Sequence, residues 1–248
     1  MVESINYHTI WGQQADRLAY LFAPELGLSR DQYIDHLPQF APQGKADKGV
    51  FDFPLLVQTA TPNLTLVRIC EVTGINVGSP NIDEMVDWRD DMIIKMWRDK
   101  RSDTITSATV DWSNDPKKFR TPSAPYSTWI NTRIQKDNSA YQTRAGLTSQ
   151  ERGGTIYDGL SLLIQKPELL DREGLALPGS EYFFDFFFSD EGTVIILTQE
   201  SNHKILGFGY AGLNYAGFQS KFHPPTGCLV ASRKIATKRR QPPSGQKP

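Results

Sequence analysis

The sequence has little of several features that would reveal a class of function. It contains only two cysteines, Cys70 and Cys228, which excludes a disulfide framework and provides no metal-ligand spacing. No segment approaches the roughly eighteen apolar residues of a membrane-spanning helix. The formal net charge is −1, so the chain lacks the overall positive field that attracts nucleic acid or an anionic membrane.

The N-terminal sequence MVESINYHTIWGQQADR has neither a basic start nor a continuous apolar segment, both of which a secretory signal needs. Disulfides are rare in reducing compartments, and the two cysteines are widely separated in the chain. We therefore expect a cytoplasmic protein that keeps both cysteines as thiols and has no membrane partner.

The composition is that of a globular protein. Of the 248 residues, 39% are hydrophobic and 11% aromatic, which is enough to fill a sizeable core. Apolar periodicity predicts helices near 5–22, 82–99 and 156–170, and strands near 51–60, 64–72, 125–134, 182–188, 193–199 and 204–210. A short helix is the alternative for 64–72. We expect one α+β domain with a mostly antiparallel mixed sheet covered by helices.

Three regions of different composition follow one another along the chain. Residues 1–40 form a helical lead-in, 41–230 the α+β core, and 231–248 a basic tail that we expect to be disordered. The core is organised around 155–220. There, Thr155 and Asp158 have the spacing of a capping box, which predicts that a helix begins after Thr155.

The same stretch carries a series of short motifs: Thr-x-x-acid-Gly-Leu-x-Leu, Gln-x-Pro-Glu-Leu-Leu, Leu-x-Gly-Ser and Leu-Gly-x-x-aromatic-Ala-Gly. The matching residues are Thr155, Asp158, Gly159, Leu160, Leu162, Gln165, Pro167, Glu168, Leu169, Leu170, Gly179, Ser180, Leu206, Gly207, Tyr210, Ala211 and Gly212. Over 152–220 the chain resembles a family of bacterial domains of unknown function that is common in actinomycetes. The resemblance supports a folded domain and implies no activity.

The segment 207–218 is the strongest candidate for a binding site. It repeats Tyr-Ala-Gly at 210–212 and 215–217. Glycines let a ligand approach the backbone closely, and the tyrosines could line a pocket. The candidate residues are Gly207, Gly209, Tyr210, Gly212 and Tyr215. The alternative interpretation is a glycine-kinked strand and turn in which aromatic rings pack over the glycines. The segment is not a phosphate-binding P-loop, because no Gly-Lys-Ser/Thr follows the glycines.

Two further residues are candidates for binding or for acid–base chemistry. Asp185 lies between phenylalanines in EYFFDFFF, where burial would raise its pKa, although an exposed strand position is the alternative. His203 precedes the glycine segment and could act with His223 and Glu200, although a turn histidine is the alternative. No compact His/Asp cluster or nucleophile motif is present, so we expect no metal and no cofactor.

These observations favour a non-catalytic binding or interaction protein with its contact surface at 207–218. Its partner would be a small molecule or another protein. The first alternative is an enzyme that acts on a small molecule through Asp185 or His203 with the nearby tyrosines. The second is a nucleic-acid-associated factor that works through the basic tail, although this tail has no interleaved aromatic residues to stack on bases.

Overall fold

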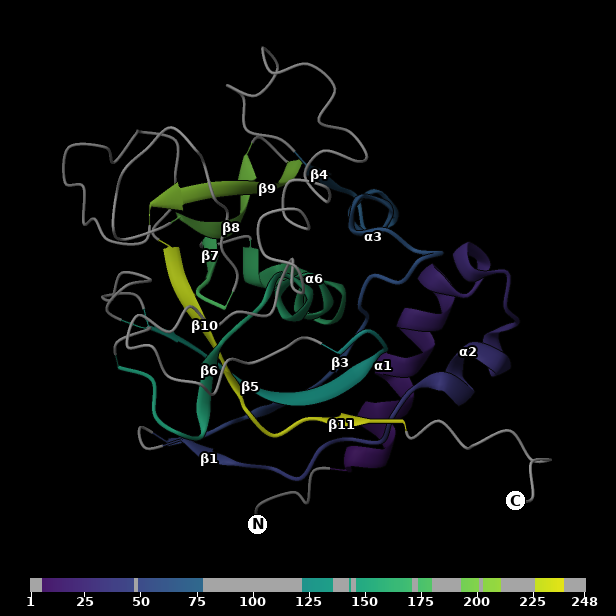
Figure 1. The fold of residues 1–248 in the computed structure, drawn as a ribbon, viewed down its shortest axis with the longest axis horizontal. Coiled ribbons are helices and arrows are strands. Elements are labelled where there is room, and N and C mark those ends of the chain that lie inside the picture. The colour runs from purple at the N-terminus through teal and green to yellow at the C-terminus, as the bar shows by residue number, and fades with distance from the viewer. Residues whose placement is uncertain are drawn as a thin grey trace, which may run out of the picture.

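The computed structural model describes residues 6–46, 49–77, 122–135, 143, 146–170, 174–179, 193–200, 203–210 and 226–238. It confirms the predicted α+β class, with a mixed, mostly antiparallel sheet and helices packed against it (Figure 1). The helices are α1 (Tyr7–Phe22), η1 (Pro24–Leu26), α2 (Arg30–His36), α3 (Leu66–Val72), α6 (Ile156–Gln165) and η2 (Pro167–Leu170). No helix in these described ranges is both long and apolar enough to cross a membrane.

The described strands form one large sheet and one small hairpin. The large sheet contains β3 (Phe53–Val57), β4 (Ile75–Val77), β5 (Tyr126–Gln135), β6 (Glu151–Gly153), β7 (Gly174–Leu177), β8 (Thr193–Glu200), β9 (His203–Tyr210), β10 (Thr226–Ser232) and β11 (Ala236–Thr237). The hairpin pairs β1 (Lys45–Ala46) with β2 (Gly49–Val50).

The order of strands in the large sheet is β11-β5-β10-β7-β8-β9-β4, with β3 paired to β5 and β6 paired to β10. The pairs β10–β7 and β4–β9 are parallel, and the other named pairs are antiparallel. A register shift between Cys228 and Val230 marks an irregularity in β10. On the edge away from β5, β10 pairs with β7 and then, after the shift, with β6.

Helices α1 and α6 contribute one side of the hydrophobic core. Asn6 begins α1 by accepting backbone N–H bonds from His8 and Thr9, and Leu18 and Phe22 are among the residues that this helix buries. The capping box predicted for α6 is present, since the Thr155 and Asp158 side chains each bond to the backbone of the other. The N-terminal helices thus share one core cluster with the sheet.

The strand predicted for 64–72 is wrong, because α3 occupies most of this run. The Thr65 side chain accepts the Arg68 N–H and caps the helix, and Leu66, Ile69 and Cys70 are buried at helical spacing. The apolar pattern of so short a run fits both the period of a helix and the period of a strand. The cap decides between them.

The predicted start of the disordered tail at 231 needs correction. β10 continues to Ser232, and β11 pairs with β5 through Ala236 and Thr237. Arg233 also bonds to this part of the fold, since its Nε donates to the Glu151 carbonyl at 2.8 Å. Residues 239–248 lie outside the described part of the chain, as do the predicted strand at 182–188 and the predicted helix at 82–99.

Candidate functional site

The structure places four of the seven predicted site residues on one strand. His203, Gly207, Gly209 and Tyr210 all belong to β9, whose predicted extent over 204–210 is confirmed. In the antiparallel pairing with β8, Gly207 lies opposite Ile196 and Gly209 opposite Val194. The other three candidates, Asp185, Gly212 and Tyr215, lie outside the described residues.

The two edges of β9 are paired to different extents. Every residue from His203 to Tyr210 has a partner on β8, whereas β4 pairs only with Lys204, Ile205 and Leu206. Within the described ranges, no strand pairs with the β4-side edge of 207–210. Residues 207 and 209 share one face of the strand because side chains alternate, so two adjacent positions on that face have no side chain. The two glycines therefore add no bulk over the backbone on this face, and no strand of the described ranges pairs with the β4-side edge beside them.

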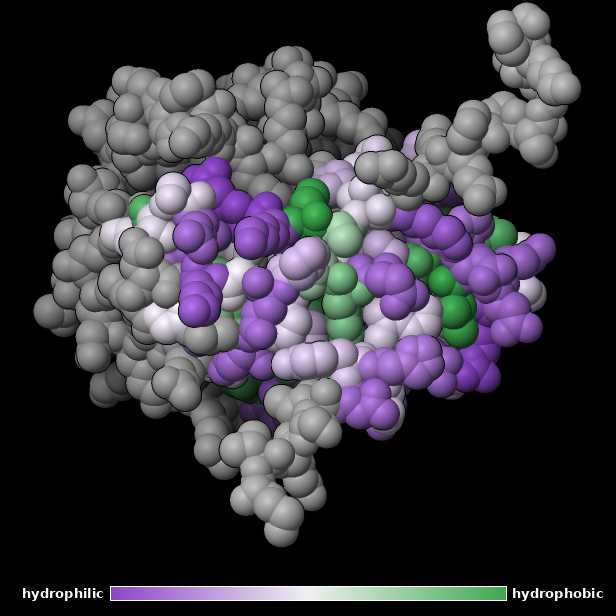
Figure 2. All heavy atoms as spheres, turned by 90° about the horizontal axis from the view of Figure 1, so that it is seen from below, coloured by the Kyte–Doolittle hydropathy of each residue, from purple (hydrophilic) through white to green (hydrophobic). Residues whose placement is uncertain are grey.

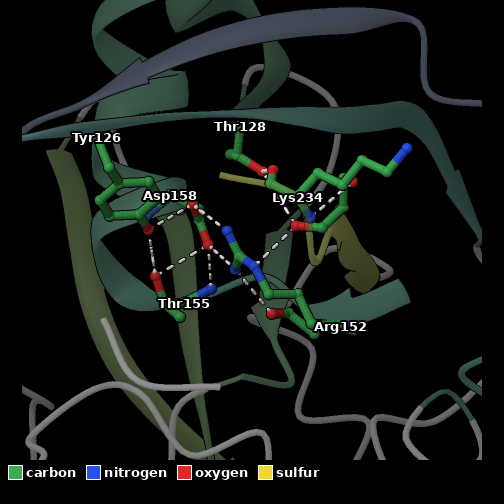
Figure 3. Close-up of polar contacts among 8 residues, drawn as sticks. Tyr126, Thr128, Arg152, Thr155, Asp158 and Lys234 are labelled. Atoms are coloured by element: carbon green, nitrogen blue, oxygen red, sulfur yellow. Dashed lines mark hydrogen bonds and ion pairs between the residues drawn. The ribbon is translucent and has the colours of Figure 1, made fainter. Parts of the chain in front are cut away.

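The fully buried charges of the described chain lie elsewhere, between β6 and the start of α6. Arg152 and Asp158 are both 0% exposed and form a bidentate ion pair, with Nη1 2.5 Å from Oδ2 and Nη2 3.0 Å from Oδ1. Figure 3 shows the guanidinium pointing at the carboxylate, with the Tyr126 hydroxyl approaching the same carboxylate from β5.

Three more hydrogen bonds are donated to the oxygen atoms of the Asp158 carboxylate. Tyr126 donates to Oδ1 at 2.8 Å, and the Thr155 N–H and hydroxyl both donate to Oδ2, at 2.8 and 2.9 Å. Arg152 also donates from Nε to the Ser232 carbonyl at 3.1 Å and from Nη1 to the Gly153 carbonyl at 3.2 Å. The pair thus joins β5, β6, β10 and the N-terminus of α6.

The ion pair outweighs the effect of burial on both charges. Burial alone would raise the pKa of Asp158, but the Arg152 guanidinium and the hydrogen bonds from Thr155 and Tyr126 lower it below its ordinary value. Burial would likewise lower the pKa of Arg152, and Asp158 reverses that effect. Burial and the Asp158 carboxylate raise the pKa of Tyr126. All three groups keep their ordinary charges at neutral pH.

This network resembles a catalytic cluster in composition, but its environment indicates a structural role. A catalytic acid or base must reach substrate and exchange a proton near the working pH. Arg152, Asp158 and Tyr126 are fully buried, and their pKa values lie away from neutrality. The spacing from Thr155 predicts the capping role of Asp158, but no local pattern links it to Arg152, and only the fold brings the two together.

Close glycine contacts hold the same region together. A Cβ on Gly153 would lie 2.4 Å from the Gly179 nitrogen, and a Cβ on Gly159 would lie 2.7 Å from a methyl group of Leu177. Real Cβ atoms do not approach other atoms so closely, so these positions require glycine. The glycines let β6 contact the turn after β7 and let α6 lie directly on the sheet.

A second polar group, the side chain of Gln14 from α1, completes the edge of β3. Its Nε2 donates to the Pro54 carbonyl at 2.7 Å, and its Oε1 accepts the Leu56 N–H at 2.8 Å. The amide thus replaces a neighbouring strand. Ser161 of α6 accepts the N–H of Gln58, the residue directly after β3, at 3.1 Å. These buried side chains also have structural roles.

The remaining chemical candidates are not supported as catalytic groups. Cys70 and Cys228 are free thiols, as predicted, and the structure buries both, which removes them from contact with a substrate. No group of three His, Cys, Asp or Glu residues in the described ranges could hold a metal ion. His223 lies outside those ranges. On the face seen in Figure 2, hydrophobic residues form small separate patches among hydrophilic ones, so the coloured surface there presents no broad apolar interface.

Comparison with protein-family models, with curated proteins and with solved structures finds no match in any of the three. The resemblance over 152–220 to bacterial domains common in actinomycetes therefore stays a prediction. The motifs that carry it nevertheless have physical roles in the fold, since Thr155 and Asp158 form the cap and Gly159 and Gly179 allow close packing.

Proposed function

We propose that this chain is a non-catalytic binding or interaction protein with its contact surface at 207–218. The observation that carries the proposal is the pairing of β9. Its final residues, Gly207–Tyr210, pair with β8 on one edge and have no described strand on the other. An extended peptide or a flat small molecule could approach the backbone there, where the two glycines add no bulk.

The buried polar groups support a binding role over catalysis. Within the described ranges, the one fully buried ion pair is saturated by internal hydrogen bonds and is shielded from solvent. Such a pair orients strands and a helix. A binding surface, in contrast, needs only a rigid support and accessible groups. The sheet provides that support for β9.

A thermal-shift screen of the purified protein against metabolites, nucleotides and divalent metals tests this proposal. It should be run in parallel on Tyr210→Ala and on Tyr20→Ala. Tyr20 is the matched control, because it is an 82% exposed tyrosine on α1, away from β9. We expect a ligand to raise the unfolding midpoint of the wild type and of Tyr20→Ala but not that of Tyr210→Ala.

Two results would count against the proposal. A ligand that stabilises all three proteins equally would place the binding site outside 207–218. Chemical turnover of a stabilising compound, followed by mass spectrometry, would show that the protein is an enzyme. If no compound shifts the midpoint, the proposal requires a protein partner, and that partner should be captured by Tyr20→Ala and the wild type but not by Tyr210→Ala.

A further inference from the structure

A hollow of about 140 Å³ opens between the helices and the β4–β9 edge of the sheet. Five aliphatic side chains form its walls: Leu21 of α1, Val72 of α3, Ile75 of β4, and Leu163 and Ile164 of α6. Figure 1 shows α3 beside β4, and α6 between the sheet and α1. Most of the lining is therefore apolar and comes from rigid elements.

Two residues with polar groups complete the lining. The Thr73 hydroxyl is committed to the end of α3, since it lies 2.8 Å from the Ile69 carbonyl and 3.0 Å from the Cys70 carbonyl and donates to them. It therefore has no proton to offer a ligand. Among the described residues that line the hollow, Lys204 of β9 is then the one whose side chain can donate to a bound molecule.

Lys204 is a half-buried cation without an acidic partner in the described chain. Its backbone pairs with Ile75 on β4 and with Gln199 on β8, which fixes the start of the side chain beside the hollow. None of the ion pairs between described residues involves it. A partly desolvated ammonium group next to an apolar hollow favours an anion that brings its own apolar tail.

The size of the hollow limits that tail. A cavity of about 150 Å³ holds a molecule the size of benzene, so this hollow suits an aliphatic chain of about five or six carbons. We propose that it binds a short aliphatic monocarboxylate, with the carboxylate on the Lys204 ammonium group and the chain between α1, α3 and α6. This site is separate from 207–218 and does not depend on the function proposed for that segment.

Isothermal titration calorimetry with hexanoate, 1-hexanol and hexylamine tests the proposal. The three probes share one chain and differ in their head group. We expect hexanoate to bind the wild type and the other two to bind at least about tenfold more weakly, since a charge-assisted hydrogen bond contributes that much. Lys204→Met should weaken hexanoate binding by a similar factor. Lys45→Met removes one positive charge at an exposed site on β1 and should leave binding unchanged.

Two more variants separate this site from others. Val72→Phe places a ring in the hollow and should abolish hexanoate binding, whereas Tyr210→Ala should bind hexanoate as the wild type does. Circular dichroism establishes that each variant is folded. The proposal is wrong if hexanoate does not bind at millimolar concentration, if 1-hexanol or hexylamine binds the wild type equally well, or if folded Lys204→Met or Val72→Phe binds hexanoate like the wild type. The comparison of probes on the wild type decides the question even if a variant does not fold.

Discussion

The ion pair between Arg152 and Asp158 leads to a prediction about stability and its dependence on pH. Replacing Asp158 with Asn keeps the volume of the side chain and removes its charge. The guanidinium of Arg152, at 0% exposure, then loses the carboxylate that it pairs with. Losing one partner of a buried pair costs about 3–5 kcal/mol. Domains of this kind have a total stability of roughly 5–15 kcal/mol, so the variant should unfold at much lower urea concentration.

Replacing Arg152 in place of Asp158 should change the stability by an amount that depends on pH. In the wild type the folded-state pKa of Asp158 lies below its ordinary value. The pair therefore stabilises the fold above about pH 4, and this contribution is lost as the pH falls further. In Arg152→Met, burial acts on Asp158 without an opposing cation, so its pKa rises. That variant should lose stability as the pH rises, and its deficit relative to the wild type should shrink in acid.

Urea unfolding between about pH 3 and pH 8, a range that includes the ordinary pKa of an aspartate carboxyl, measures both effects. The double variant Arg152→Met/Asp158→Leu removes both charges of the pair, so it should be less destabilised than the sum of the two single variants by more than about 0.5 kcal/mol. Additive single effects would refute the coupling. A deficit of Arg152→Met that does not change with pH would refute the electrostatic explanation.

Three further predictions concern other buried positions. Gly159→Ala should destabilise the protein by about 1–3 kcal/mol in urea unfolding because the new methyl group would clash with leucines of β7 and β8. Gly12→Ala, whose Cβ meets nothing within 4 Å, should instead stabilise α1 by up to about 1 kcal/mol, and equal effects would contradict the packing argument. Gln14→Met should lower the unfolding midpoint, since two backbone groups of β3 would lose their partners; an unchanged midpoint would show that the edge of β3 needs no cap. Burial raises the pKa of the Cys70 thiol to about 12, so Cys70 and the buried Cys228 should react with a thiol reagent at pH 8 only after unfolding; rapid labelling of the native protein would contradict their burial.

Local signals in the sequence were sufficient for the start of α6 and for several strands. Thr155 precedes α6 and accepts a backbone N–H from its first turn, and the spacing to Asp158 reveals this cap in the sequence. The apolar runs that form β8 and β9 are each bounded by polar residues. The run at 64–72 was ambiguous because so short a segment does not separate the period of a strand from that of a helix.

The sequence could not reveal features that depend on distant residues. Arg152 stands among polar residues and glycines, and nothing nearby indicates that Asp158, Tyr126 and Ser232 surround it in the fold. β6 and β10 are likewise stabilised by long-range pairing between residues about eighty positions apart. The hollow at Lys204 needs three helices and two strands to form, and no single motif contains that information.

Amide hydrogen exchange of the free protein, measured by NMR, tests most directly whether the end of β9 offers an accessible backbone to a partner. We predict that amides of 207–210 that point away from β8 exchange rapidly, whereas those of 204–206 are protected by pairing on both edges. Uniform slow exchange across His203–Tyr210 would contradict the account, because it would mean that the chain itself already covers the proposed contact edge.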